Sequence, residues 1–191
     1  MKGMVFRAFE NFVESRWPDE LADDMMSLDS LPSGGAYTTV GNYAHSEFLT
    51  MAVYVAETTK TPIKSLVTEF GEVLFQNLAS AHTEMVKSYK SPIELLAVIE
   101  SVIHRDVRKL YDNTELPRFD VKSHIPEKSI ELEYSSARPF ADLAHGLIWG
   151  CLDFYGVKEI SSVKRNDVTQ DGTRSVFKVT TNHDDQRGGH A

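Results

Sequence analysis

Apolar side chains recur at helical spacing through the first two thirds of the chain. Near the start they stand three and four residues apart: Val5, Phe6, Phe9, Phe12 and Val13. This spacing predicts an amphipathic helix, because such positions lie on one helix face. A proline and two acids after Trp17 predict the start of a second helix. Further helices are predicted over residues 48–57, 61–78 and 91 to about 111, with a break at 31–35.

One glycine interrupts this pattern. Gly71 stands inside the helix predicted over residues 61–78. A glycine in a helix interior costs about 1 kcal/mol relative to alanine. We therefore expect another part of the chain to approach its backbone closely.

The last third of the chain changes period. Strands are predicted over residues 118–124 and 129–136, a helix over 140–155 that Gly156 ends, and a hairpin of 157–168 and 173–181 around Asp171-Gly172. Helices followed by strands with a helix between them predict an α+β fold with an antiparallel sheet of about four strands. Residues 182–191 have almost nothing to pack, so we expect a disordered tail.

Composition and charge exclude several classes of protein. The 191 residues fit one domain with a sizeable core. A net charge of −8 argues against nucleic acid as the main partner. The lone Cys151 excludes an internal disulfide and a zinc site made of several cysteines. No apolar run approaches the ~18 residues of a membrane span and no secretory signal is evident, so we expect a cytoplasmic protein without membrane contact.

One histidine has an unusual place on the helix predicted over residues 91–111. The apolar face of that helix consists of Leu96, Ile99, Ile103, Val107 and Leu110. His104 lies just off the edge of this face, on the same flank as Glu100. It is either a boundary histidine that touches solvent or a neutral imidazole aimed into a second pocket, where it could ligate iron. Periodicity by itself favours the boundary histidine.

A polar row follows on the second predicted strand. Tyr134, Ser136 and Arg138 would point to one strand face, about 6.6–6.8 Å apart at each step, and Pro139 favours extended geometry at Arg138. An arginine fork with two neutral donors suits a ligand that carries two carboxylates or phosphates. The alternative is a solvated strand face. Pro117 either ends a turn or forms a rigid wedge against a flat ligand.

In this order, these segments resemble the H-NOX family, the haem-nitric oxide/oxygen binding domain that is also the sensor part of soluble guanylate cyclase. The matching pieces are the helix around His104 (103–111), Pro117, and Tyr134, Ser136 and Arg138 as the family's Tyr-x-Ser-x-Arg signature. Residues 1–3, 70–72 and 140–150 are also similar to the family. The likeness spans about residues 1–181.

The resemblance implies ferrous haem b between a helical lobe (about 1–60) and a C-terminal lobe (about 61–181). His104 would be the only protein ligand of the iron, and the signature residues would hold both propionates. Pro117 would press on the porphyrin and distort it. The other residues expected at the cofactor are apolar: Val5, Phe9, Leu74, Leu78, Ile103, Leu143 and Leu147.

The distal side of the haem decides which gas binds, since bound O₂ needs a hydrogen-bond donor and NO does not. In the family's oxygen binders a distal tyrosine stands five residues after the signature arginine, where this chain has Leu143. The companion positions, Phe9 and Leu74, are also apolar. We therefore expect a pocket that excludes O₂ and selects NO and, more weakly, CO. An alignment displaced by one helical turn would instead bring in Tyr37, Tyr43 or Tyr54.

The resemblance implies a regulatory switch and not an enzyme. NO would break the bond between iron and His104, and a partner in trans, a histidine kinase or a cyclic-di-GMP enzyme, would read the change. No zinc site is expected, because residues 161–181 lack cysteine and histidine. A hydrolase built on Ser135 or Ser136 with Asp142 and His145 would lack the usual Gly-x-Ser-x-Gly elbow. The remaining alternative is a haem-free module that binds an acidic small ligand through the polar row.

Overall fold

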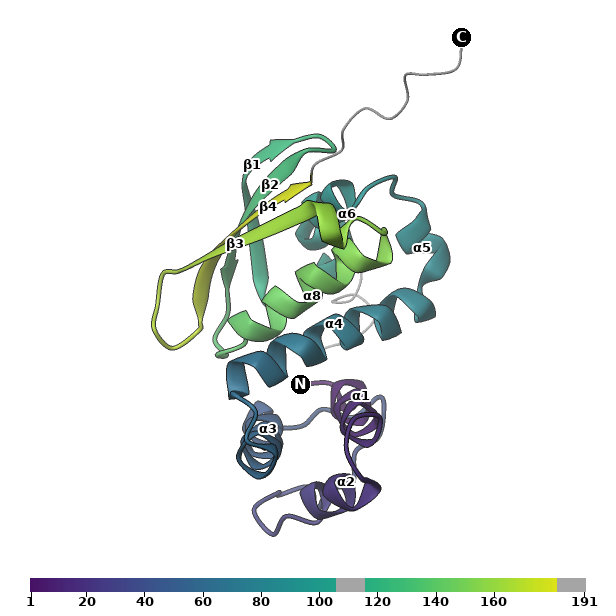
Figure 1. Ribbon diagram of the computed structural model, residues 1–191, viewed down its shortest axis with the longest axis vertical. Coiled ribbons are helices and arrows are strands. Elements are labelled where there is room, and N and C mark those ends of the chain that lie inside the picture. The colour runs from purple at the N-terminus through teal and green to yellow at the C-terminus, as the bar shows by residue number, and fades with distance from the viewer. Residues whose placement is uncertain (106–115, 182–191) are drawn as a thin grey trace.

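The fold is that of a computed structural model, which describes residues 1–105 and 116–181. The helices are α1 (Gly3–Glu14), α2 (Asp19–Met26), α3 (His45–Thr59), α4 (Ile63–Ala81), α5 (Thr83–Lys87), α6 (Pro92–Val98) and α8 (Ala141–Phe154), with a π-helical segment η1 (Ile99–His104) and a 3₁₀ turn η2 (Lys158–Ile160). The strands are β1 (Arg118–Ile125), β2 (Ser129–Ser135), β3 (Ser161–Asp167) and β4 (Arg174–Thr181). Figure 1 shows α1, α2 and α3 at one end, the sheet with α6 and α8 at the other, and α4 between them.

Aromatic side chains fill the centre of the helical end. Phe9 of α1 is fully buried, and its ring meets Phe48 of α3 at 5.1 Å and Phe70 of α4 at 5.0 Å between centroids. Both pairs are edge-to-face, a geometry that adds about 0.5–1.5 kcal/mol beyond the buried area. The apolar face predicted for the first helix is thus the face that joins three helices.

Two helices far apart in sequence cross closely at the middle of the molecule. A Cβ atom at Gly71 of α4 would lie 2.6 Å from the carbonyl oxygen of Leu143 in α8. A Cβ atom at Gly146 of α8 would overlap the carbonyl oxygen of Thr68 and lie 2.8 Å from the Cα of Gly71. The close backbone approach expected at Gly71 is therefore present, and glycine on both helices makes it possible.

The strands form one antiparallel sheet in the order β1-β2-β4-β3. Alternate residues of β2 and β4 are buried on one face, among them Leu132, Tyr134 and Phe177. Buried residues of α6 and α8 belong to the same cluster, so these helices cover that face. The expected α+β fold with a four-stranded antiparallel sheet is confirmed.

Three local expectations need correction. The strand predicted from residue 157 begins at Ser161, because Gly156 (φ 67°) and Val157 close α8: the amide of Val157 donates to the carbonyl of Leu152 at 3.0 Å. The short helix α5 was not predicted. The long helix expected from residue 91 is α-helical only to Val98 and continues as η1, whose wider turn the 3.6-residue repeat does not describe.

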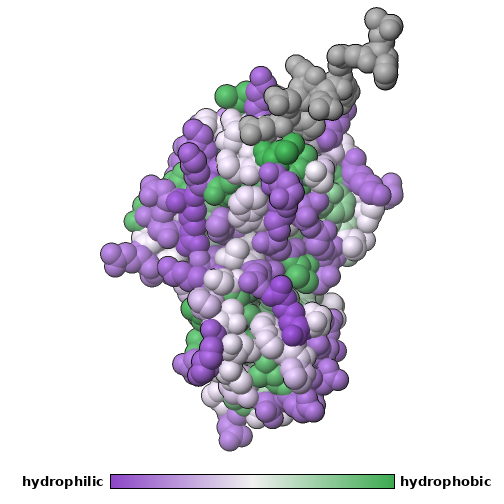
Figure 2. All heavy atoms as spheres, viewed as in Figure 1, coloured by the Kyte–Doolittle hydropathy of each residue, from purple (hydrophilic) through white to green (hydrophobic). Residues whose placement is uncertain are grey.

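The remaining expectations for that helix, at Val107, Leu110 and Tyr111, and for the tail at 182–191 lie outside the described residues. Within the described ranges, no helix is long and apolar enough to cross a membrane. Figure 2 shows a mainly hydrophilic face on which hydrophobic residues are scattered.

Candidate cofactor site

Tyr134 lies near the end of β2 with its side chain almost completely buried. Its ring packs edge-on against Phe119 of β1, the residue opposite it in register, at 5.4 Å between centroids, and against Phe177 of β4 at 6.4 Å. Its hydroxyl donates to the carbonyl of Arg138 at 3.5 Å. Burial raises the pKa of Tyr134, so the phenol remains a neutral donor.

Ser136 and Arg138 lie in the turn that follows β2, and this corrects the expected strand face. Because β2 ends at Ser135, the polar row does not continue as an extended strand. The hydroxyl of Ser136 accepts a hydrogen bond from the amide of Arg138 at 3.1 Å, and the Nε atom of Arg138 is buried. The turn therefore keeps Tyr134 and Ser136 bonded to the backbone of Arg138, although by a different geometry from that expected.

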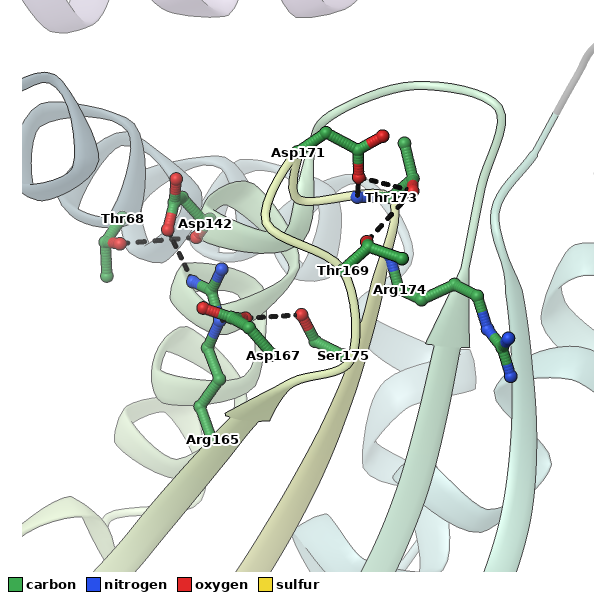
Figure 3. A network of polar contacts seen from close by, with 9 residues as sticks. All are labelled: Thr68, Asp142, Arg165, Asp167, Thr169, Asp171, Thr173, Arg174 and Ser175. Carbon is green, nitrogen blue, oxygen red and sulfur yellow. Dashed lines mark hydrogen bonds and ion pairs between the residues drawn. The ribbon is translucent and has the colours of Figure 1, made fainter.

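Residues 136–140, between β2 and α8, are here called the signature turn. The turn between β3 and β4 holds them through backbone hydrogen bonds. The carbonyl of Thr173 accepts a hydrogen bond from the amide of Ser136 at 2.9 Å, and that of Gly172 accepts one from Ala141 at 3.1 Å. The carboxylate of Asp171 accepts bonds from the amide and hydroxyl of Thr173, at 3.0 and 2.6 Å (Figure 3). Two backbone bonds thus fix the start and the end of the signature turn.

An ion-pair network joins the same hairpin to α8. Arg165 of β3 pairs with Asp142 of α8 and, at 2.5 Å, with Asp167, whose carboxylate also accepts from the hydroxyl of Ser175 at 2.6 Å (Figure 3). The hydroxyl of Thr68 in α4 donates to the carbonyl of Asp142 at 3.3 Å. The Arg165 side chain is only 14% exposed, so water screens these pairs less than pairs at the surface. The hairpin that holds the signature turn is therefore itself linked to α8, and α8 is linked to α4.

His104 is the last residue of η1, and its side chain is 15% exposed. Its Nδ1 atom lies 3.1 Å from Oε2 of Glu100, one helical turn earlier. When Nδ1 donates this hydrogen bond, Nε2 carries the lone pair that a metal requires. The imidazole centroid lies 5.8 Å from that of Phe119, the neighbour of Tyr134. His104, the candidate metal ligand, and Tyr134 of β2 therefore both contact the ring of Phe119.

The apolar residues expected at the cofactor divide between two buried clusters. One buried cluster contains Phe9, Leu74 and Leu143, with the partly buried Val5, Leu78 and Leu147 against it. Ile103 instead packs with the sheet cluster, which also contains Phe119 and Tyr134. Pro117 is half-buried immediately before β1.

Tyr37, Tyr43 and Tyr54 are the tyrosines that a displaced alignment would bring to the distal side. The hydroxyl groups of the first two already have hydrogen-bond partners in or near the loop before α3. The hydroxyl of Tyr37 donates to the buried carboxylate of Glu47 at 3.1 Å, and burial raises the pKa of Tyr37 to about 12. The hydroxyl of Tyr43 accepts from the amide of Thr38 at 2.8 Å. Tyr54 is partly buried against the same cluster.

Sequence reasoning missed the support by the β3–β4 turn, and it placed His104 and Glu100 on one flank of a helix without pairing them. The support by the β3–β4 turn had no signal in the sequence, because its bonds join backbone groups more than thirty residues apart. The pair of Glu100 and His104 did have a signal, since residues four apart on a helix are neighbours. The third member, the amide of Phe119, donates to Oε2 of Glu100 at 3.3 Å and comes from a strand.

The donor set fits haem. An imidazole nitrogen is an axial ligand for haem iron, and neutral and cationic donors suit propionates. The apolar cluster suits the faces of a porphyrin. The described residues contain no group of three or more His, Cys, Asp or Glu side chains that could hold a separate metal ion.

Comparison with known proteins places the chain in a family. The family model HNOB, described as haem-NO-binding, matches residues 2–162. The unliganded Fe(II) H-NOX protein of K. algicida is 30% identical, with a TM-score of 0.89, and the match covers 96% of this chain and 98% of that one.

Two further solved structures hold gas ligands. The IWP-051-bound H-NOX protein of Shewanella woodyi, in the Fe(II)CO state, is 36% identical with a TM-score of 0.79, covering 100% of this chain and 97% of that one. The H-NOX protein of S. oneidensis in the Fe(II)NO state is 26% identical with a TM-score of 0.81, covering 96% and 100%. No match was found among the curated proteins. The chain therefore belongs to the haem-NO-binding, or H-NOX, family.

Proposed function

We propose that this protein is a haem-based nitric oxide sensor, in which His104 is the only protein ligand of the iron of haem b. The observation that carries the proposal is that His104 and Tyr134 both contact the ring of Phe119. This shared contact brings the candidate iron ligand next to β2, where the Tyr-x-Ser-x-Arg signature begins. We assign both propionates to Tyr134, Ser136 and Arg138. The helical lobe (about 1–60) and the C-terminal lobe (about 61–181) hold the haem between them.

When bound, ferrous haem would supply an iron atom that can take a diatomic gas; His104 would hold that iron, and binding of NO would release His104. The chain itself selects the gas through Phe9, Leu74 and Leu143, which offer no hydrogen-bond donor and so leave O₂ without stabilisation. NO binds without a donor, and CO binds more weakly. The relatives solved with NO and CO support binding of both gases by this family.

The apolar wall and the wedge complete the site. Val5, Ile103, Leu78 and Leu147 would line the macrocycle with apolar side chains and exclude water from it. Pro117, fixed by its ring directly before β1, presses on the porphyrin.

Release of His104 is the signal in this proposal. Once the imidazole is no longer held, the helical segment of His104 is free to move, and the population of conformations shifts toward one that a partner recognises. The protein is thus a cytoplasmic regulatory domain and not an enzyme, and its partner is a histidine kinase or a cyclic-di-GMP enzyme.

Ligand replacement tests the iron ligand. The purified wild-type protein is expected to be orange-red, with five-coordinate ferrous iron under argon. His104→Gly should lose the native spectrum and regain it with added imidazole, because the small ligand fills the vacated position. A native spectrum of His104→Gly without imidazole would show that another residue ligates the iron. A colourless wild-type protein that does not take up haem would favour the haem-free module for acidic ligands.

A further inference from the structure

Glu100 has a position that the proposed function does not by itself explain. Among the described residues, its Oε2 atom receives hydrogen bonds from Nδ1 of His104 at 3.1 Å and from the backbone amide of Phe119 at 3.3 Å. The Glu100 side chain is 28% exposed and that of His104 is 15% exposed. One carboxylate oxygen thus joins the end of η1 to β1.

This arrangement differs from an ordinary charged pair on a helix surface. Arg7 and Glu10 of α1 form such a pair, three residues apart, with the arginine side chain 50% exposed. Pairs of that kind stay on one helix and contribute little to stability, because water surrounds them. Glu100 also reaches a backbone donor nineteen residues later, on another element. Glu100 therefore links η1 to β1, in addition to pairing with His104 on its own helix.

We propose that Glu100 is a positioning residue that fixes the tautomer and orientation of His104 and ties it to β1. The inference rests on the proposed function, because it concerns the nitrogen assigned to the iron. A carboxylate that accepts from Nδ1 leaves the lone pair on Nε2 and makes the imidazole a stronger electron donor. The bond between iron and His104 is then stronger than one made by an imidazole without this partner.

The second bond gives Glu100 a role in transmission as well. Phe119 stands opposite Tyr134 in the register of β1 and β2. The bond from the Phe119 amide to Glu100 therefore couples the orientation of His104 to β1, the strand beside the one that carries Tyr134. A displacement of His104 therefore acts on β1 and on the residue that faces Tyr134.

The test compares Glu100→Gln and Glu100→Ala with wild type in the haem-loaded full chain. Resonance Raman spectra of the ferrous protein report the iron–histidine stretching frequency directly. We expect this frequency to fall in both variants, and further in Glu100→Ala, because glutamine keeps an acceptor oxygen but no charge. Transfer of haem to apomyoglobin should become about 10-fold faster or more, the range typical for loss of an outer-shell partner.

Glu84→Gln is the matched control, because Glu84 is an exposed glutamate on another helix, α5. It should leave both readouts unchanged. An unchanged stretching frequency in both Glu100 variants, or an equal change in Glu84→Gln, would overturn the proposal. Circular dichroism verifies that the nearly isosteric Glu100→Gln folds.

The two proposals fail in different ways. If His104→Gly abolishes the iron–histidine stretch and the Glu100 variants leave it unchanged, only the role of Glu100 is wrong. If His104→Gly keeps the wild-type stretch, the assignment of the iron ligand itself is wrong.

Discussion

At the crossing of α4 and α8, replacing a helix glycine by alanine should lower the stability of the protein, whereas this replacement usually raises it. Replacing an interior helix glycine by alanine normally stabilises a helix by about 1 kcal/mol. At Gly146 the added methyl group would overlap the carbonyl oxygen of Thr68 and lie 2.8 Å from the Cα of Gly71. Both obstacles are backbone atoms, so no side-chain rotation relieves them and the helices must separate.

The expected magnitude follows from these opposing effects. Overpacking a close-packed interior costs about 1–3 kcal/mol, and a backbone clash belongs at the upper end. After the gain in helix propensity, Gly146→Ala should lose about 2 kcal/mol of unfolding free energy. For a chain of this size, that loss lowers the melting temperature by about 4–8 °C.

Thermal and urea unfolding followed by circular dichroism measure this change. Gly71→Ala should destabilise for the same reason, and the double variant should cost less than the sum, because one separation of the helices accommodates both methyl groups. Ser80→Ala, on the exposed side of α4, should change stability by less than about 0.5 kcal/mol. An unchanged or higher melting temperature for Gly146→Ala would refute the reasoning.

Three further predictions concern the site and the sheet. Arg138→Ala should lose haem faster than Arg105→Ala, because only the former is assigned to the propionates; equal rates of haem transfer would contradict that role. Leu143→Tyr should gain an O₂ complex in air, since it adds a donor to the distal side; an unchanged aerobic spectrum would count against the pocket assignment. Burial, and next the charge of Arg165, lower the pKa of His145, so the unfolded chain takes up the proton first. Wild type should therefore lose stability as the pH falls below about 6.5, by up to ~1.4 kcal/mol per pH unit, and more than His145→Gln in urea titrations; equal pH dependence of the two proteins would contradict this.

Long periodic segments allowed most of the fold to be predicted from the sequence. The helix of Phe9 and the helix of Phe70 bury the faces that their spacing indicates, because burial of an apolar stripe decides both. The end of α8 was predicted at Gly156, but Val157 belongs to its cap and not to a strand. Val157 joins the cap through one backbone hydrogen bond, to the carbonyl of Leu152, and the pattern of side chains does not indicate such a bond.

The site was less accessible to sequence reasoning. The signature was expected as a straight row on a strand, whereas Ser136 and Arg138 lie in a turn held by Thr173 and Gly172. These partners come from a hairpin that folds back from later in the chain, so local propensity cannot indicate them. The π-helical form of η1 likewise departs from the 3.6-residue repeat, so the spacing of apolar side chains does not indicate it. The roles assigned to the site residues stay predictions that the experiments above decide.

The most direct test of the central claim is an NO titration of the ferrous protein, followed by absorption and electron paramagnetic resonance spectroscopy. We predict that saturation with NO gives five-coordinate iron from which His104 has been released, whereas CO gives six-coordinate iron with His104 retained. A nitrosyl spectrum that keeps a histidine ligand at saturation would contradict the account.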